Sequence, residues 1–189
     1  MDYAQTRETL SGHRARIEAL RAEMRQIQAD VIPQPVADYE LSRPGGPVRL
    51  SELFGAKDDL FVIHNMGTGC PACTMWADGF NGVYDHLADR AAFVVSSPNT
   101  PDVQRAFAAG RGWRFPMVSH QGTSFAADMG YHRNGGWQPG LSVFQRQGDQ
   151  ILRVSDTELG PNDDFCSAWH MFAMLPQGAA GWFPKFNYA

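Results

Sequence analysis

The feature that most constrains the fold of this chain is a pair of cysteines, Cys70 and Cys73, in a Cys-Pro-Ala-Cys segment. The apolar run 60–63 before it has the composition of a buried strand, and residues 74–87 after it have the spacing of a helix. Gly67 and Gly69 permit a tight turn between the two. A Cys-x-x-Cys pair placed between a strand and a helix is typical of a redox dithiol. The sequence therefore predicts an α/β fold with the cysteines at the start of a helix.

This position predicts different roles for the two sulfurs. The first N–H groups of a helix have no intrahelical partners and the helix dipole is positive there, so a sulfur at that point is stabilised as a thiolate. We expect Cys70 to cap the helix, to be partly exposed and to attack the substrate, because the thiolate is the nucleophile. Cys73, one turn later, is expected to be shielded and to resolve the intermediate. Pro71 suits the first helical position, where its missing N–H costs nothing.

Composition limits the class of protein. The 189 residues, 43% apolar and 19% charged, suffice for one well-buried domain with appendages. A formal net charge of −4 argues against nucleic acid as a partner. Three cysteines do not resemble the framework of a small secreted domain, and the N-terminus lacks the apolar core of a signal peptide. No stretch approaches a membrane span, so we expect a cytoplasmic protein that does not contact membranes.

The N-terminal segment is predicted to be one long helix over residues 2–32. Leu10, Ile17, Met24 and Val31 recur every seven positions, which gives the helix an apolar stripe. The repeat is short, which favours packing on the chain's own domain; the alternative is a homodimer contact. We expect residues 1–35 to form a helical extension, residues 36–175 the main domain and residues 176–189 a tail laid on the surface.

Within the main domain the pattern predicts a hairpin and then alternating strands and helices. The expected hairpin strands are 39–41 and 48–50, followed by a helical turn at 51–54. Strand 92–95 should run parallel to strand 60–63, because a helix connects them. The remaining expected elements are helix 100–110, strand 117–119, hairpin strands 141–145 and 150–154, and helix 162–174.

These elements in this order resemble the thioredoxin-like fold, an α/β fold with a central mixed sheet flanked by helices, here with an N-terminal helical extension and a β-hairpin. Pro139 lies at the start of the second hairpin, where thioredoxin-like proteins place a cis-proline beside the active sulfur. The resemblance therefore implies a cis peptide before Pro139 and a place for this residue in the site. Segments 48–53 and 115–119 also resemble the peroxiredoxin branch of the fold.

A closer resemblance is to the domain of unknown function 899 (DUF899) family, described as predicted dithiol-disulfide oxidoreductases. It rests on the segments Cys70–Cys73, Trp76–Gly82, Gly112–Pro116 and Pro139–Phe144, and covers about residues 39–172. The family usually has a Tyr- and Ser-rich stretch after the second hairpin, whereas residues 156–164 are acidic here. The resemblance implies disulfide exchange at Cys70 and Cys73.

Other residues have a functional and a structural interpretation. His64 lies six residues before Cys70, where it is either a proton shuttle for the second thiol or a hydrogen-bonded core histidine. Trp76, Trp113 and Gln138 are candidate substrate-binding residues, although aromatic side chains are normally core. No metal or cofactor is expected, because the histidines and Cys166 lack the paired spacing of zinc ligands.

The sequence thus favours a thiol-disulfide oxidoreductase whose partner is a substrate protein or a small-molecule disulfide. One alternative is a thiol peroxidase of the peroxiredoxin type, although the signature Pro-x-x-x-Thr-x-x-Cys is absent. A second alternative is a non-enzymatic thioredoxin-like binding module.

Overall fold

The computed structural model describes residues 1–188 and divides the chain into two compact units, Met1–Pro33 and a second that begins at Gln34. Helix α1 (Tyr3–Ala29) makes up most of the first unit. Its start is a capping box, because the Asp2 carboxylate accepts from the Gln5 N–H while the Gln5 side chain accepts from the Asp2 N–H. The first strand, Gln34–Val36, spans the boundary predicted after residue 35.

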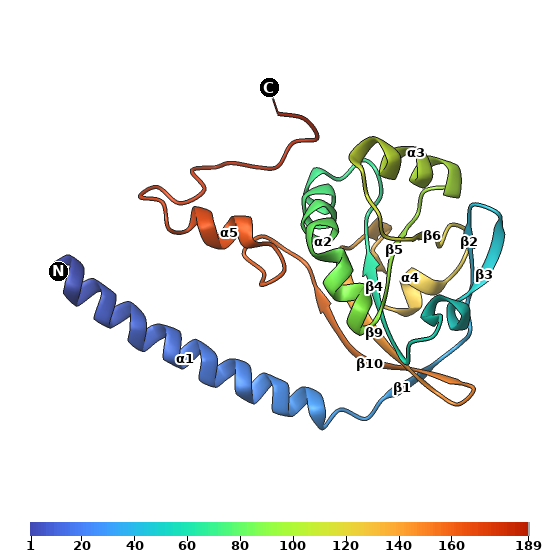
Figure 1. Cartoon of the computed structure of the whole chain (residues 1–189), viewed down its shortest axis with the longest axis horizontal. Coiled ribbons are helices and arrows are strands. Elements are labelled where there is room, and N and C mark those ends of the chain that lie inside the picture. The colour runs from blue at the N-terminus through green and yellow to red at the C-terminus, as the bar shows by residue number, and fades with distance from the viewer. Residues whose placement is uncertain (189) are drawn as a thin grey trace. The chain divides into compact units, whose positions relative to one another are not determined.

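The second unit is built on an eight-stranded mixed sheet with the order β1-β10-β9-β4-β5-β6-β2-β3 (Figure 1). Strands β4, β5 and β6 are parallel to one another, and the other pairs in the sheet are antiparallel. A separate two-stranded hairpin, β7–β8, precedes β9. The strands are β1 (Gln34–Val36), β2 (Glu40–Arg43), β3 (Gly46–Arg49), β4 (Asp59–His64), β5 (Ala92–Ser97), β6 (Met117–Ser119), β7 (His132–Arg133), β8 (Gly136–Trp137), β9 (Gly140–Gln147) and β10 (Gln150–Glu158).

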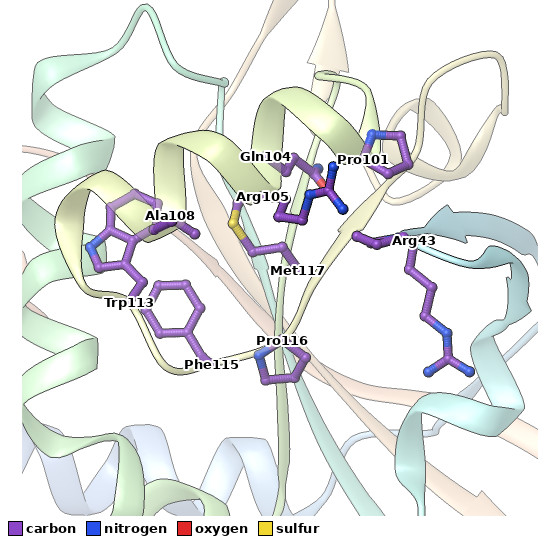
Figure 2. A pocket seen from close by; sticks show the side chains of 11 residues that line it. Arg43, Pro101, Gln104, Arg105, Ala108, Trp113, Phe115, Pro116 and Met117 are labelled. Carbon is purple, nitrogen blue, oxygen red and sulfur yellow. The ribbon is translucent and has the colours of Figure 1, made fainter.

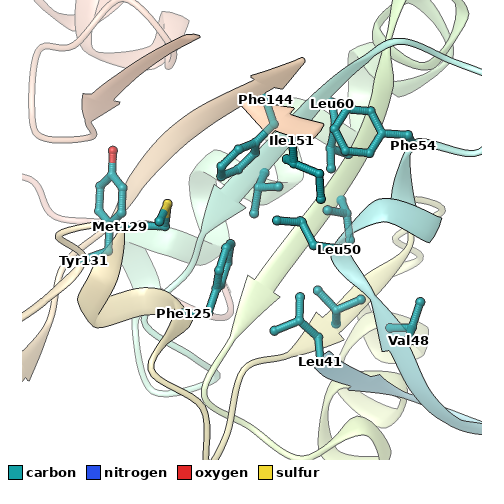
Figure 3. Packing of buried hydrophobic residues seen from close by; sticks show 13 residues of the cluster. Leu41, Val48, Leu50, Phe54, Leu60, Phe125, Met129, Tyr131, Phe144 and Ile151 are labelled. Carbon is teal, nitrogen blue, oxygen red and sulfur yellow. The ribbon is translucent and has the colours of Figure 1, made fainter. Parts of the chain in front are cut away.

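Helices cover both faces of the sheet. α2 (Pro71–Arg90) and α3 (Pro101–Arg111) are the crossovers that parallel strands require, and they pack on one face, where α5 (Ser167–Phe172) joins them through Trp169. The 3-10 helix η1 (Leu50–Phe54) and α4 (Phe125–Asp128) cover the other face. Figure 3 shows the core on that second face, where Phe125 and Phe144 meet the aliphatic side chains of the sheet.

The alternation along β4 decides which residues face α2. Leu60 and Val62 belong to the core under η1 and α4, whereas Ile63 belongs to the core under α2. Because successive side chains of a strand point to opposite faces, His64 lies on the side of Leu60 and Val62. The thioredoxin-like fold predicted from the sequence, with its central mixed sheet, is confirmed.

The expected cis peptide before Pro139 is wrong: no cis peptide bond occurs within residues 1–188. The Gln138 N–H donates to the Tyr131 carbonyl at 2.9 Å, and the Pro139 carbonyl accepts from the Leu159 N–H at 3.0 Å. These pairings hold the chain extended on both sides of the bond as it enters β9. There is therefore no tight turn to offset the cost of a cis bond.

The predicted helix over residues 162–174 is shorter than expected, since α5 begins only at Ser167. The Asp163 carboxylate accepts hydrogen bonds from the N–H groups of Gly160, Phe165 and Cys166 at 2.8–3.1 Å. Such side-chain bonds compete with helical ones and hold the segment in a turn. The short elements β1, α4, β7 and β8 were not predicted. Among the helices of residues 1–188, none combines the length and apolarity needed to cross a membrane.

Candidate active site

Two asparagines hold the loop between β4 and α2. Asn65 accepts a hydrogen bond from the Gly67 N–H at 2.7 Å, and Asn99 accepts from the Thr68 N–H at 2.9 Å. Gly67 has a φ of +100°, and a Cβ at this position would lie 2.6 Å from the Asn99 side-chain oxygen, so only glycine fits. Sequence reasoning missed both asparagines. Asn65, two residues before a glycine, is the signal of an Asx turn that would have indicated the first of them.

Cys70 is the N-cap of α2, as the sequence predicts. Its Sγ accepts a hydrogen bond from the Cys73 N–H at 3.0 Å, and its carbonyl accepts from the Thr74 hydroxyl at 3.0 Å. Pro71 occupies the first helical position. Both cysteines are free thiols, with Cys70 half-buried and Cys73 only 3% exposed. The sulfur that caps the helix is therefore the one that a substrate can reach.

The two thiols differ in acidity because each acts on the other. The hydrogen bond from the Cys73 thiol, supported by the Cys73 and Ala72 N–H groups, lowers the pKa of Cys70 to about 7 against the effect of burial. The same hydrogen bond, burial and the negative charge on Cys70 raise the pKa of Cys73 far above its ordinary value. At neutral pH Cys70 is thus substantially a thiolate, while Cys73 keeps its proton.

His64 is buried, with 2% of its surface exposed, on the face of the sheet away from α2. Its Nε2 is hydrogen-bonded to the Ser142 hydroxyl at 2.9 Å, and its ring stacks on Tyr131 with 3.9 Å between centroids. Burial, with the nearby His120 and Arg153, lowers the pKa of His64 well below its ordinary value, so the ring is neutral. These contacts are those of a hydrogen-bonded core histidine, and the shuttle role stays a prediction.

The structure brings some of the predicted site residues together. Cys73, Trp76, Pro139 and the His64 end of β4 surround one small gap between α2 and the start of β9, which has no room for a water molecule. Trp76 is buried, and its indole N–H has no hydrogen-bond partner in the described part of the chain. The substrate-binding role predicted for Trp76 stays a prediction.

The other two candidate substrate-binding residues lie elsewhere. The Trp113 indole N–H donates to Asp78 at 2.8 Å on the α3 side of the domain. Gln138 follows the β7–β8 hairpin, where its backbone pairs with Tyr131. Residues 1–188 contain no group of three or more His, Cys, Asp or Glu side chains placed to hold a metal ion.

Comparison with known proteins identifies a family and a fold. The model of the family described as bacterial protein of unknown function (DUF899) matches residues 6–185. The peroxidoxin BcpB from Mycobacterium tuberculosis superposes with a TM-score of 0.55 at 27% identity, over 67% of this chain and 84% of that one. No protein with a curated description matches the chain.

Two further solved structures have the same fold. Reduced Prx3 from Vibrio vulnificus, in complex with hydrogen peroxide, gives a TM-score of 0.56 at 16% identity, over 70% of this chain and 91% of that one. A putative protein disulfide isomerase from Bacteroides thetaiotaomicron gives 0.54 at 19% identity, over 71% and 82%. At these identities the two likenesses show that the fold is shared.

Proposed function

We propose that this chain, which belongs to the DUF899 family of bacterial proteins, is a thiol-disulfide oxidoreductase whose Cys70–Cys73 dithiol exchanges with substrate disulfides. One observation carries the proposal: Cys70 Sγ caps α2 and accepts a hydrogen bond from Cys73, which lowers the pKa of Cys70 to about 7. A thiol whose pKa lies near the ambient pH is the best attacking group in disulfide exchange. Its substrate is a disulfide of a protein or of a small molecule, and we place the reaction in the cytoplasm.

In the first step the Cys70 thiolate attacks one sulfur of the substrate disulfide. A bond forms between Cys70 and that sulfur, the substrate S–S bond breaks, and the other substrate sulfur leaves as a thiolate that takes a proton from water. In the second step Cys73 loses its proton and attacks Cys70, which releases the second substrate thiol. The two electrons come from the dithiol, which ends as the Cys70–Cys73 disulfide, and a thiol reductant then restores it.

The first step itself prepares Cys73 for the second. The hydrogen bond to the Cys70 sulfur is the largest cause of the raised pKa of Cys73, and the charge on Cys70 adds to it. Both effects end when Cys70 becomes part of a mixed disulfide, because that sulfur is then neutral. The hydrogen bonds from the Met66 and Cys73 N–H groups, which lower the pKa of Cys73, remain. Cys73 therefore becomes more acidic at the moment when it must attack.

The test is reduction of a chromogenic aromatic disulfide and of insulin by the purified protein with a thiol reductant. The Cys70→Ser variant should lose activity, and Cys73→Ser should accumulate a mixed disulfide with the substrate that mass spectrometry detects. Cys166→Ser is the matched control, because Cys166 is a buried free thiol outside the motif. Full activity of Cys70→Ser with both substrates would reject Cys70 as the nucleophile. A wild-type protein that reduces neither substrate would reject the proposal and favour a non-enzymatic binding module.

The peroxiredoxins among the similar structures favour a second candidate, a thiol peroxidase. The Cys70 thiolate would attack a peroxide oxygen, break the O–O bond and become a sulfenic acid; Cys73 would then displace water to form the disulfide. Gly67 stands where the peroxiredoxin signature has threonine, and its φ and the closeness of Asn99 exclude a side chain there. Because this threonine is missing, we rank the peroxidase below the disulfide oxidoreductase. Peroxide consumption that depends on Cys70 and exceeds disulfide reduction would reverse the order.

A further inference from the structure

We propose that α1 is a dimerisation helix, which pairs antiparallel with α1 of a second copy of this chain. In the structure α1 is one unbroken helix (Figure 1), and no residue of Tyr3–Ala29 is buried. At about 1.5 Å per residue, a helix of 27 residues is roughly 40 Å long. The proposal goes beyond disulfide exchange and does not rest on it.

An apolar stripe with the period of a coiled coil runs along α1. Its large side chains occupy the a and d positions of successive heptads, and each is 45–73% exposed: Leu10, Ile17, Leu20, Met24 and Ile27. Single exposed apolar side chains are common and need no explanation. A row of them at a and d positions is the surface that a second helix covers in a coiled coil.

The stripe is complementary to itself when the second helix runs in the opposite direction. In an antiparallel pair each a position faces a d position. Ile17 then packs against the partner's Leu20, and Leu10 packs against the partner's Ile27. The two-fold symmetry of such a pair repeats each contact, so one surface serves both copies. A second copy of α1 therefore covers the stripe from Leu10 to Ile27.

The charges that flank the stripe fit the same register. At the g positions Arg16 lies opposite the partner's Glu23, and symmetry repeats this attractive pair. At the e positions Arg14 lies opposite the partner's Arg21. Glu18 pairs with Arg21 at 2.8 Å within the helix and offsets this repulsion. Because flanking charges set the choice of partner and direction in coiled coils, the Arg16–Glu23 pairs favour a second copy of α1 as the occupant.

A parallel pair fits these charges less well. It would place Arg16 opposite the partner's Arg21. Its attractive pair, Asp2 with the partner's Arg7, uses a carboxylate that already accepts the hydrogen bond of the α1 cap.

The size of the second unit also favours the antiparallel direction. That unit begins at Gln34, just after α1, and a body of its length has a radius of gyration of about 15 Å. Paired helices lie only about 10 Å apart, so a parallel pair would attach two such bodies side by side. An antiparallel pair separates the two points of attachment by roughly 40 Å.

The test is sedimentation equilibrium of the full-length protein, with a reductant that keeps every cysteine a thiol. We expect a concentration-dependent equilibrium between monomer and dimer, unchanged in Cys70→Ser. Leu20→Asp places a charge in the centre of the stripe and should give a monomer. Ala22→Asp places the same charge on the opposite face of α1 and is the matched control, which should dimerise as the wild type does. Thermal unfolding of each variant establishes that it is folded.

Exchange of charges tests the direction of the pair. Arg16→Glu and Glu23→Arg each place like charges opposite one another and should weaken the dimer severalfold, whereas the variant with both substitutions should regain the affinity. The proposal is overturned if the wild type stays monomeric at every concentration, which would leave α1 to pack on its own chain. It is also overturned if Leu20→Asp keeps the dimer, or if Arg16→Glu alone tightens the dimer, as a parallel pair requires.

Discussion

The Cys73 backbone N–H donates a hydrogen bond to Cys70 Sγ across 3.0 Å, so the second cysteine of the motif helps to ionise the first. The Cys73 thiol adds its own hydrogen bond, which is the largest cause of the lowered pKa of Cys70. The motif is therefore more than two sulfurs near each other. It places a half-buried nucleophile beside a buried thiol whose proton stabilises the nucleophile's charge.

The first prediction concerns the acidity of Cys70. The ultraviolet absorbance of the thiolate in the reduced protein should titrate with a midpoint near the pKa of about 7. Cys73→Ala removes the thiol donor and should move the midpoint of Cys70 upward, toward the ordinary pKa of about 8.5. Cys166→Ala should leave it in place. A Cys73→Ala protein that titrates like the wild type would show that the Cys73 thiol does not stabilise the Cys70 thiolate.

The second prediction concerns acid stability. His120 is buried, its Nδ1 is hydrogen-bonded to the Ser96 hydroxyl at 2.8 Å, and burial, then the nearby His132, lowers its pKa to about 4. The folded state therefore holds a neutral ring where the unfolded chain binds a proton. This contribution to the free energy of unfolding is complete above the unfolded pKa of about 6.5 and is lost as the pH falls toward 4.

The expected loss from His120 is about 2 kcal/mol between roughly pH 7 and pH 5. Urea unfolding at the two pH values measures it. His120→Gln should lose less stability over this interval than the wild type does, although it is less stable overall. His86→Gln, on the exposed surface of α2, is the control and should lose as much as the wild type. Equal losses in the wild type and His120→Gln would refute a buried neutral His120.

The third prediction concerns the contact of Gly140 with Tyr131. A Cβ on Gly140 would lie 1.9 Å from the Tyr131 ring. That ring is buried against His64, and its hydroxyl donates to the Leu141 and Thr157 carbonyls at 3.2 and 3.1 Å, so it cannot move aside. Gly140→Ala should cost at least roughly 2 kcal/mol of unfolding free energy. Gly160→Ala, with open space at its Cβ, should change stability little in the same denaturation experiment.

The fourth prediction concerns the link between α2 and α3. Asp78 accepts hydrogen bonds from the Trp113 indole N–H at 2.8 Å, from Arg111 Nε at 2.9 Å and from Arg111 Nη2. Asp78→Asn removes the charge and turns one acceptor into a donor that faces these N–H groups. It should destabilise the protein by roughly 1–2 kcal/mol, measured by chemical denaturation.

Asp85→Asn is the matched control for this link. The Asp85–Arg114 pair also joins α2 to the chain after α3, but both side chains are mostly exposed, so its loss should cost less than about 1 kcal/mol. If both substitutions lower the free energy of unfolding equally, the hydrogen bonds of Asp78 stabilise the protein no more than an exposed ion pair does.

Local sequence signals predicted the local geometry. A cysteine followed by proline at a strand-to-helix junction indicated that Cys70 caps α2 and that Pro71 begins it, and both are confirmed. The parallel pairing of β4 with β5 followed from the length of the helix between them, and it is confirmed as well. The fold and the family are also confirmed, since the resemblance rested on four segments in a fixed order.

Features that depend on distant partners could not be predicted. The trans bond before Pro139 depends on pairing with Tyr131 and Leu159, and the sequence does not indicate either contact. Successive side chains of a strand point to opposite faces, and a shift of one residue in the register would turn His64 to the other face. The sequence does not fix that register. Arg43, at the end of β2, and Arg105, on α3, border the same cavity (Figure 2) although they lie 62 positions apart in the chain. Hairpin packing brings them together, and no local pattern shows it.

The most direct test of the central claim is titration of the purified protein in glutathione redox buffers, with Cys70 and Cys73 followed by thiol alkylation and mass spectrometry. A working dithiol predicts one reversible two-electron transition in which both cysteines lose reactivity together while Cys166 remains a thiol. If Cys70 and Cys73 never form a disulfide with each other at any buffer ratio, the oxidoreductase mechanism is contradicted.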